Sequence, residues 1–323
     1  MSPSSAALAF EAEMAMAHIP VLTSELMGLL QVEADSRVVD CTFGAGGHAS
    51  AVAAHLGAQG LLIACDRDPV AEAYFETMRQ KFHSPARFCA GNFADTLAYL
   101  RESGFSATHV YMDLGLSSMQ VDTEERGFSY GYDAPLDMRM DPALDVTAAD
   151  IINGRTEAEL SHIFRAYGEE QYARQIARAV VRRRQRAPFE RTAELVETVK
   201  QAIPTPARFG ARNPARRVFQ ALRIAVNDEL ESLRRALPEA LGLLEPGGVL
   251  AVISFHSLED RIVKQFFQSQ ARPCICPPSL PVCACGRVPT MEILTPRPLI
   301  PKARERQANP RSSSAKLRAA RRL

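Results

Sequence analysis

Residues 38–50, VVDCTFGAGGHAS, combine a strand, three glycines and a helix start. Gly44, Gly46 and Gly47 fall within four positions, after two β-branched valines that favour a strand. Glycines at a strand-to-helix turn let a ligand approach the backbone, where N–H groups at the helix N-terminus can bind it. Glycines also form plain turns, so the loop predicts either a cofactor site or a tight connection.

Asp66 lies 20 positions after Gly46, at the end of the apolar segment GLLIACD. In doubly wound sheets an acid at this place accepts hydrogen bonds from ribose hydroxyls. The glycine loop and the acid together indicate an adenosine-containing cofactor. S-adenosylmethionine fits better than a dinucleotide, because Gly46-Gly47-His48 is not an ideal loop for a pyrophosphate. An empty structural turn is the third alternative.

Asp113 ends another strand-like segment, ATHVYMD, beside the expected reactive end of the cofactor. Transfer of a methyl cation to nitrogen needs in-line approach of an amine lone pair. An acceptor for the amine N–H groups helps to localise that lone pair. Asp113 is therefore the candidate catalytic residue, and an aspartate that caps a neighbouring loop is the alternative.

The elements that position these residues alternate between strand and helix patterns in the first third of the chain. This alternation predicts an α/β fold with a parallel sheet, whose ligand crevice lies at the carboxyl ends of the strands. The predicted strands cover residues 37–43, 60–66, 86–93, 107–115 and, much later, 247–255.

Between the fourth and fifth predicted strands the pattern becomes helical, after an aperiodic stretch at 115–150. Asn213 suits the N-cap of a long helix there. A helix at 257–267 and a final hairpin near 290–300 follow the fifth strand, and the basic tail lacks a clear core element. We predict a flexible extension at residues 1–17. A discontinuous cofactor-binding domain is predicted at residues 18–120 and 221–323. An inserted, mostly helical substrate-recognition domain is predicted at residues 121–220.

The composition is that of a globular protein, with 46% hydrophobic and 23% charged residues in 323. No uncharged apolar run is long enough for a bilayer, and the N-terminus lacks a basic region before its mildly apolar stretch. We therefore expect a cytoplasmic protein with no membrane partner. The seven cysteines do not resemble a secreted disulfide framework.

The formal net charge of +1 hides two basic segments. Residues 151–220 carry 14 Lys/Arg against 7 Asp/Glu, and residues 270–323 carry 11 against 2. Basic charge gathered in segments of a near-neutral chain indicates a polyanionic partner. Solvated helix faces are the simpler alternative.

Eight blocks occur in an order that resembles the bacterial ribosomal RNA small subunit methyltransferase H (MraW-like) family, over about residues 18–318. This family methylates N4 of a cytidine in the decoding centre of 16S rRNA. Ordered blocks are far more specific than a single glycine loop. They are HIPVL, DCTFGAGGH, DLGLSSMQ, RGFSY, PLDMRMD, FQALRIAVNDEL, SFHSLEDRIVK and NPRSSSAKLR.

The resemblance implies a class I S-adenosylmethionine-dependent methyltransferase with a Rossmann-like sheet and a helical insert. It implies that the substrate is 16S rRNA, in the small ribosomal subunit, and it identifies no protein partner. Rival hypotheses are a non-catalytic RNA-binding assembly factor and an NAD-dependent oxidoreductase. The cofactor site implied by the resemblance comprises Gly46, Gly47, His48, Asp66, Phe93, Asp113 and Gln120.

The segment RGFSYGYDAPLDMRMD places Arg126, Asp137 and Arg139 among aromatic residues. Interleaved aromatic and arginine side chains can stack on splayed bases and hold phosphates. We predict RNA contacts for these three residues, while an ion pair between Asp137 and Arg139 is the structural alternative. The two roles are compatible.

The run VVRRRQR contains Arg183 and is predicted to contact backbone phosphates. Three consecutive arginines fan around a helix, so only part of the run can face one surface. The target base must leave any stack to reach the cofactor.

In SFHSLED, Ser257 and Asp260 have the spacing of a helix capping box. Ser254 and His256 then fall at the carboxyl end of the fifth predicted strand. Either could contact the flipped base or its ribose, and a loop histidine with a structural partner is an equal alternative for His256.

Four cysteines crowd into CICPPSLPVCAC, namely Cys274, Cys276, Cys283 and Cys285. Two C-x-C pairs six residues apart could surround a tetrahedral zinc ion. They could equally be four reduced loop thiols, because the spacing is not that of the usual C-x-x-C knuckle. No metal is predicted in the catalytic site.

Overall fold

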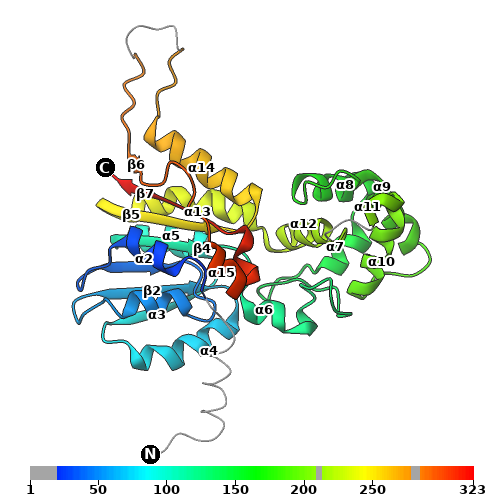
Figure 1. Cartoon of the computed structure of the whole chain (residues 1–323), viewed down its shortest axis with the longest axis horizontal. Coiled ribbons are helices and arrows are strands. Elements are labelled where there is room, and N and C mark those ends of the chain that lie inside the picture. The colour runs from blue at the N-terminus through cyan, green and yellow to red at the C-terminus, as the bar shows by residue number, and fades with distance from the viewer. Residues whose placement is uncertain (1–19, 209–212, 278–283) are drawn as a thin grey trace, which may run out of the picture. The chain divides into compact units, whose positions relative to one another are not determined.

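The structure of the chain is a computed structural model that describes residues 20–208, 213–277 and 284–323 (Figure 1). The extension predicted at residues 1–17 lies outside these described residues. Within the described ranges, no helix is both long enough and apolar enough to cross a membrane.

The chain forms two compact units. Met1–Gly115 and Glu231–Leu323 make up the first, and Leu116–Leu230 makes up the second. The sequence prediction drew the borders after residues 120 and 220 instead. It therefore assigned both ends of the second unit, residues 116–120 and 221–230, to the sheet domain.

A seven-stranded sheet forms the centre of the first unit, in the order β3-β2-β1-β4-β5-β7-β6. Strands β1 to β5 all run parallel to one another, whereas β7 runs antiparallel to both of its neighbours, β5 and β6. The predicted α/β, Rossmann-like sheet is thereby confirmed. The strands are β1 (Arg37–Asp40), β2 (Leu61–Asp66), β3 (Ala86–Ala90), β4 (Ala107–Asp113), β5 (Leu244–Ser254), β6 (Met291–Ile293) and β7 (Lys316–Arg322).

Helices cover both faces of this sheet, as Figure 1 shows. The short 3-10 turns are η1 (Arg79–Lys81) and η3 (Pro310–Ser314). The α-helices are α2 (Thr23–Leu30), α3 (Gly47–Ala53), α4 (Pro69–Met78), α5 (Phe93–Glu102), α13 (Glu229–Leu243), α14 (Ser257–Ala271) and α15 (Ala303–Ala308).

Alternate residues of each strand enter different cores, because successive side chains of a strand point to opposite faces. Val39 packs in a core with residues of α5, α13 and α14, such as Leu97. Val38 packs in a second core with residues of α2, α3 and α4, such as Phe75. Both faces of β1 are therefore buried, which explains its uninterrupted apolar pattern.

The basic tail forms a central strand, so the prediction that it lacks a core element is wrong. In β7, Leu317 and Ala319 enter one core and Ala320 enters the other. The predicted hairpin at 290–300 is also wrong, because β6 pairs with β7 rather than with a neighbouring segment. The charged composition of KLRAARR concealed the strand.

Arg318, in the middle of β7, is buried because it pairs with Asp260 of α14. Its Nε donates to Oδ1 of Asp260 over 2.6 Å, and Nζ of Lys316 lies 3.2 Å from Oδ2. Burial would raise the pKa of Asp260, but the two cations outweigh it and lower the pKa. The tail strand is thus tied to the helix that covers it. This contact also replaces the predicted Ser257–Asp260 capping box.

Replacing Asp260 with alanine should lower the free energy of unfolding by about 3 kcal/mol, because it leaves the buried Arg318 guanidinium uncompensated. Wild type should begin to lose the same stability as pH falls below about 4, and should lose all of it once the pH is below the lowered pKa of Asp260. Urea denaturation measures both effects. Glu292→Ala, which removes an exposed ion pair with Arg321, is the control and should cost under about 1 kcal/mol. Equal losses in the two variants would contradict the prediction.

The second unit is helical, as predicted, and has its own core. Leu160 and Phe164 pack there with Ile176, Val180 and Leu195, at spacings that place apolar residues on one face of each helix. Its elements are α6 (Ser118–Asp122), η2 (Glu124–Arg126), α7 (Ala148–Gly154), α8 (Glu157–Ala166), α9 (Ala173–Arg184), α10 (Thr192–Ala202), α11 (Thr205–Arg208) and α12 (Arg216–Asn227).

The long helix predicted from Asn213 is two helices. The predicted N-cap is wrong, because α12 has Ala215 as its N-cap. Asn213 lies before the helix, where its Oδ1 accepts the Ala215 N–H over 2.9 Å. Asp228 adopts a left-handed conformation with φ 49° and ends α12. Phe219 and Leu222 of α12 are buried in the core of the second unit.

Candidate functional site

The glycine loop joins β1 to α3 at the carboxyl edge of the parallel strands. Gly46 has φ 77° and precedes the first residue of α3. A Cβ on Gly46 would lie 2.7 Å from Cζ of Phe43 and would also clash with Sδ of Met78. A Cβ on Gly47 would lie 3.1 Å from Cβ of Pro20. Packing and left-handed geometry within the unit therefore require glycine at position 46.

Asp66 closes this loop from the end of β2. Its Oδ2 accepts the Gly44 N–H over 2.7 Å, and its Oδ1 accepts the Asp68 N–H over 2.9 Å. Burial raises the pKa of Asp66, and these backbone hydrogen bonds oppose the increase. A carboxylate has about four lone-pair sites, so each oxygen can still accept one hydroxyl. This geometry fits the ribose role predicted for Asp66.

Phe93 begins α5 after the end of β3 and is half-buried against the core that contains Leu97. The helix is capped by Asn92, whose Oδ1 accepts the Ala94 N–H over 3.0 Å. The ring therefore has core contacts, and it follows the end of β3, where Ala90 pairs with Asp66. The predicted cofactor contact of Phe93 stays a prediction.

Asp113 ends β4 beside the glycine loop. Its N–H donates to Oγ1 of Thr42 over 2.6 Å, which ties the strand end to the segment after β1. Its Oδ2 lies 3.3 Å from Nε2 of His48. Its Oδ1 is buried and has no hydrogen-bond partner among the described residues. A buried acceptor of this kind is costly unless a ligand satisfies it.

His48 lies beneath this carboxylate, on the first turn of α3, and is only 6% exposed. Burial alone would lower the pKa of His48, but the carboxylates of Asp113, Asp40 and Glu305 outweigh it and raise the pKa. The ring meets Tyr111 edge to face, with centroids 6.2 Å apart. His48 thus faces one oxygen of Asp113 and leaves the other available.

Asp40 is a buried acid below the same edge that the sequence analysis did not single out. Its Oδ2 accepts the Tyr111 hydroxyl over 2.7 Å, and its Oδ1 accepts the Thr42 N–H over 2.9 Å. Burial raises the pKa of Asp40 to about 7, against the opposing effect of these hydrogen bonds and of His48. Asp40 belongs to the segment VVDCTFGAGGHAS that contains the three glycines. Only the folded structure shows that its side chain is buried.

The raised pKa of Asp40 predicts a specific pH dependence of stability. Between its ordinary value of 3.8 and about 7, the folded chain holds a proton that the unfolded chain has lost. Stability should therefore fall with rising pH across this range, by about 1.4 kcal/mol per pH unit, and level off above it. Asp40→Asn, which cannot ionise, should lack this fall. Urea denaturation of both proteins from pH 4 to 8 tests this, and parallel curves would contradict it.

Ser254 and His256 lie at the end of β5, as predicted, and both have structural partners. Oγ of Ser254 donates weakly to the Lys316 carbonyl over 3.4 Å. His256 is the N-cap of α14, where its Nδ1 accepts the Glu259 N–H over 3.4 Å and Glu259 accepts the His256 N–H over 3.2 Å. The capping box therefore consists of His256 and Glu259, which corrects the predicted Ser257–Asp260 pair. The substrate role of both residues stays a prediction.

Gln120 lies in the second unit, whereas the glycine loop belongs to the first unit. It is 4% exposed and forms a capping box at the start of α6. Its N–H donates to Oγ of Ser117 over 3.3 Å, and its Oε1 accepts the Ser117 N–H over 3.2 Å. The predicted cofactor contact of Gln120 remains a prediction.

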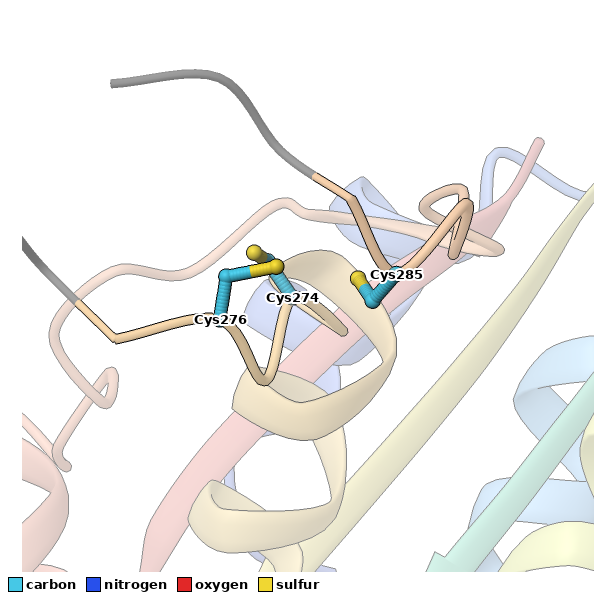
Figure 2. A group of neighbouring side chains, drawn as sticks. All are labelled: Cys274, Cys276 and Cys285. Carbon is cyan, nitrogen blue, oxygen red and sulfur yellow. The ribbon is translucent and has the colours of Figure 1, made fainter. Parts of the chain in front are cut away.

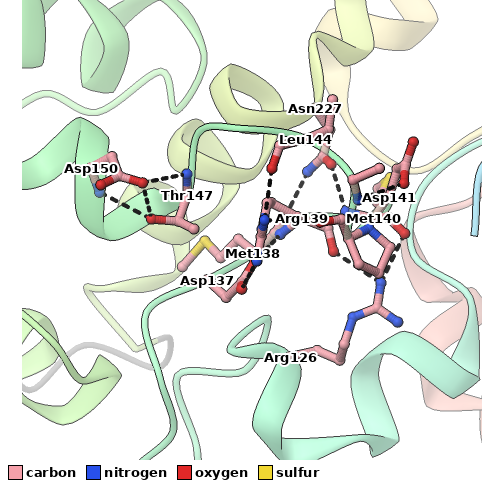
Figure 3. Close-up of polar contacts among 12 residues, drawn as sticks. Arg126, Asp137, Met138, Arg139, Met140, Asp141, Leu144, Thr147, Asp150 and Asn227 are labelled. Carbon is pink, nitrogen blue, oxygen red and sulfur yellow. Dashed lines mark hydrogen bonds and ion pairs between the residues drawn. The ribbon is translucent and has the colours of Figure 1, made fainter.

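Figure 3 shows how the loop after η2 is held in the second unit. Arg139 forms a two-pronged ion pair with Asp137, with Nε–Oδ1 and Nη2–Oδ2 distances of 2.9 and 2.8 Å. Arg126 donates to the carbonyls of Arg139 and Met140 over 2.9 and 2.8 Å. The structural alternative proposed for Asp137 and Arg139 is thus present, and RNA contacts by these three residues stay predictions.

Asn227 anchors the same loop and was missed by the sequence analysis. It is 2% exposed, accepts the Met140 N–H over 2.7 Å and donates to the Met138 carbonyl over 2.7 Å. Met138 adopts φ 65°, a conformation that is uncommon for a non-glycine residue. The only signal in the sequence was a polar residue on the apolar side of a helix.

The basic run divides within α9, as its helical geometry predicts. Arg183 pairs with Glu194 through a short contact of 2.5 Å and stacks over Phe189, 4.4 Å from the ring centroid. Arg184 donates to the carbonyls of Ile152 and Arg155. The structure therefore gives Arg183 a structural role, and its predicted phosphate contact stays a prediction. Arg182, in contrast, is exposed.

Comparison with known proteins gives consistent matches along the chain. The model of the MraW methylase family matches residues 15–323. A Ribosomal RNA small subunit methyltransferase H from Syntrophotalea carbinolica is 49% identical over 95% of this chain and 98% of its own length. Its counterpart from Geobacter sulfurreducens is 48% identical over 96% of this chain and 100% of its own length. Identity at this level over the whole length is shared by members of one family.

Proposed function

Since the chain belongs to the MraW methylase family, we propose that it transfers a methyl group from S-adenosylmethionine to N4 of a cytidine in 16S rRNA. The substrate is the RNA of the small ribosomal subunit, and the reaction takes place in the cytoplasm. One observation in the first unit carries the catalytic part of this proposal. It is the buried Oδ1 of Asp113, which lacks a protein partner within the described ranges.

The carboxyl edge of the sheet fits the cofactor. Asp66 has lone pairs left for two ribose hydroxyls beside its bonds to Gly44 and Asp68. Phe93 offers an apolar surface for adenine at the start of α5. The Gly47 N–H lies at the start of α3, where a helix N-terminus favours negative charge such as the cofactor carboxylate. The Gly46 N–H already donates to the Phe43 carbonyl over 2.8 Å.

When bound, S-adenosylmethionine supplies a methyl group on a sulfonium centre. Asp113 acts on the nucleophile. Its free Oδ1 accepts a hydrogen bond from the exocyclic amine, which turns the nitrogen lone pair out of conjugation and towards the methyl group. Asp113 then takes the amine proton that is released as the nitrogen–carbon bond forms. His48 holds Oδ2 at 3.3 Å and keeps the carboxylate oriented.

The second unit supplies the charge for an RNA substrate. Residues 151–220 contain twice as many basic as acidic residues, and Arg182 and Arg186 of this segment are exposed. Arginines at an exposed helix end contact phosphates, and such binding weakens steeply with salt. The target cytidine must leave its stack to expose the amine.

Methyl transfer tests the proposal directly. Small subunits and naked 16S rRNA that lack the modification are incubated with the protein and labelled S-adenosylmethionine, and the nucleosides are analysed by mass spectrometry. We expect N4-methylcytidine at one position. Cofactor binding without transfer to either substrate would favour a non-catalytic assembly factor. Transfer to another atom would overturn the proposed acceptor while leaving the enzyme class intact.

A further inference from the structure

Three cysteines from two separate segments meet in the loop between α14 and β6. The sulfur atoms of Cys274, Cys276 and Cys285 all lie within 4.8 Å of one another. Figure 2 shows the three side chains turned towards a common space. Cys285 lies nine positions after Cys276. Closeness in sequence alone therefore does not explain why the three thiols converge.

The described part of the loop that carries them lacks an apolar core. None of the described residues at 271–277 and 284–290 is buried. Its base is closed by hydrogen bonds, because Thr290 donates to Gln270 through its N–H over 3.0 Å and through Oγ1 over 2.8 Å. A segment that buries so little apolar surface usually needs a covalent or metal cross-link to keep one structure.

The surroundings of the sulfur atoms favour a metal. The Ala284 N–H points at Sγ of Cys276 over 3.3 Å, and a backbone donor of this kind stabilises negative charge on sulfur. Sulfur ligands select soft or borderline ions, among which zinc takes a tetrahedral set of thiolates. A zinc–sulfur bond of about 2.3 Å requires sulfur atoms about 3.8 Å apart, which is compatible with the present separations of at most 4.8 Å.

We propose that Cys274, Cys276 and Cys285 bind a structural zinc ion that cross-links the two arms of this loop. Three thiolates leave one tetrahedral position for a further donor such as water. We assign no role to Cys283, which lies outside the described residues. The ion takes no part in methyl transfer, so the proposal is independent of the function proposed above.

Metal analysis of the full-length protein, purified without chelators, tests the site. We expect about one zinc per chain, and tetrahedral cobalt–thiolate absorption after exchange with Co²⁺. Cys276→Ser and Cys285→Ser should each lose most of the metal. Cys89→Ser is the control, because Cys89 lies in β3 outside the cluster, and it should keep the zinc. Far-UV circular dichroism verifies that each variant is folded.

Proteolysis provides a second, independent readout. Removing zinc with a chelator should speed cleavage between residues 272 and 290 by about tenfold, because the described part of the loop buries no side chain. Cleavage elsewhere should not change. Wild type that contains no zinc and takes up no cobalt would overturn the proposal. Full metal content in both cysteine variants, or a disulfide among the three cysteines in unreduced peptide maps, would do the same.

Discussion

Asp113→Asn should lower the rate constant of methyl transfer by about 100- to 1,000-fold. The side chain keeps its shape, but a neutral amide is a weaker acceptor for the amine N–H groups and cannot take the released proton. It also loses the charge that faces Nε2 of His48 at 3.3 Å. Single-turnover transfer to unmodified small subunits, with protein in excess, measures this step without product release.

The Asp113 prediction needs proof that the cofactor still binds. Calorimetry should show that the dissociation constant of S-adenosylmethionine changes by less than about tenfold in Asp113→Asn, since only one contact is altered. Glu102→Gln, the same chemical change at an exposed position of α5, should retain full activity. If Asp113→Asn transferred methyl groups at the wild-type rate, the amine partner would have to be sought elsewhere, with His256 as the next candidate.

Asp66→Ala should weaken S-adenosylmethionine binding by about 100-fold, the equivalent of about 3 kcal/mol. Two hydroxyl hydrogen bonds to a carboxylate are lost, and each is worth roughly 1.5 kcal/mol or more. The change also removes the acceptor of the Gly44 N–H at 2.7 Å, so the glycine loop loses support. Asp66→Asn should fall between wild type and alanine, because one oxygen acceptor remains.

Titration calorimetry of the folded variants, with S-adenosylmethionine and with its demethylated product, measures the Asp66 effect. Both ligands carry the same ribose, so both should weaken equally. Glu72→Ala on α4 removes an exposed acid a few residues later and should bind normally. An unchanged affinity in Asp66→Ala would rule out the ribose contact and leave Asp66 with only its backbone partners.

Much of the first unit could be predicted because its signals are local. Strands β1, β2 and β4 are short apolar runs that end in Asp40, Asp66 and Asp113, and glycine marks the turn that follows β1. In a parallel sheet such strand ends gather at one edge. The positions of Asp66 and Asp113 beside the glycine loop therefore followed from the order of elements.

The tail strand β7 could not be predicted, for an equally physical reason. A strand is recognised by apolar residues on a buried face, but Arg318 occupies that face and is neutralised by Asp260, 58 positions earlier. A partner so distant in sequence leaves no mark on the local pattern. The predicted role of Asp260 as a helix cap was wrong for the same reason.

The sequence by itself determined the α/β order, the edge at which the acids meet and the helical character of the insert, because periodicity and glycine act on neighbouring residues. Only the tertiary structure decided which polar groups are already satisfied. It gave Arg139 and Arg183 partners within their own unit, paired Asp40 with Tyr111 and brought Cys285 to Cys274. It also left Oδ1 of Asp113 without a partner in the described part of the chain. Whether a polar atom is satisfied depends on groups that are distant in sequence, and folding alone brings them together.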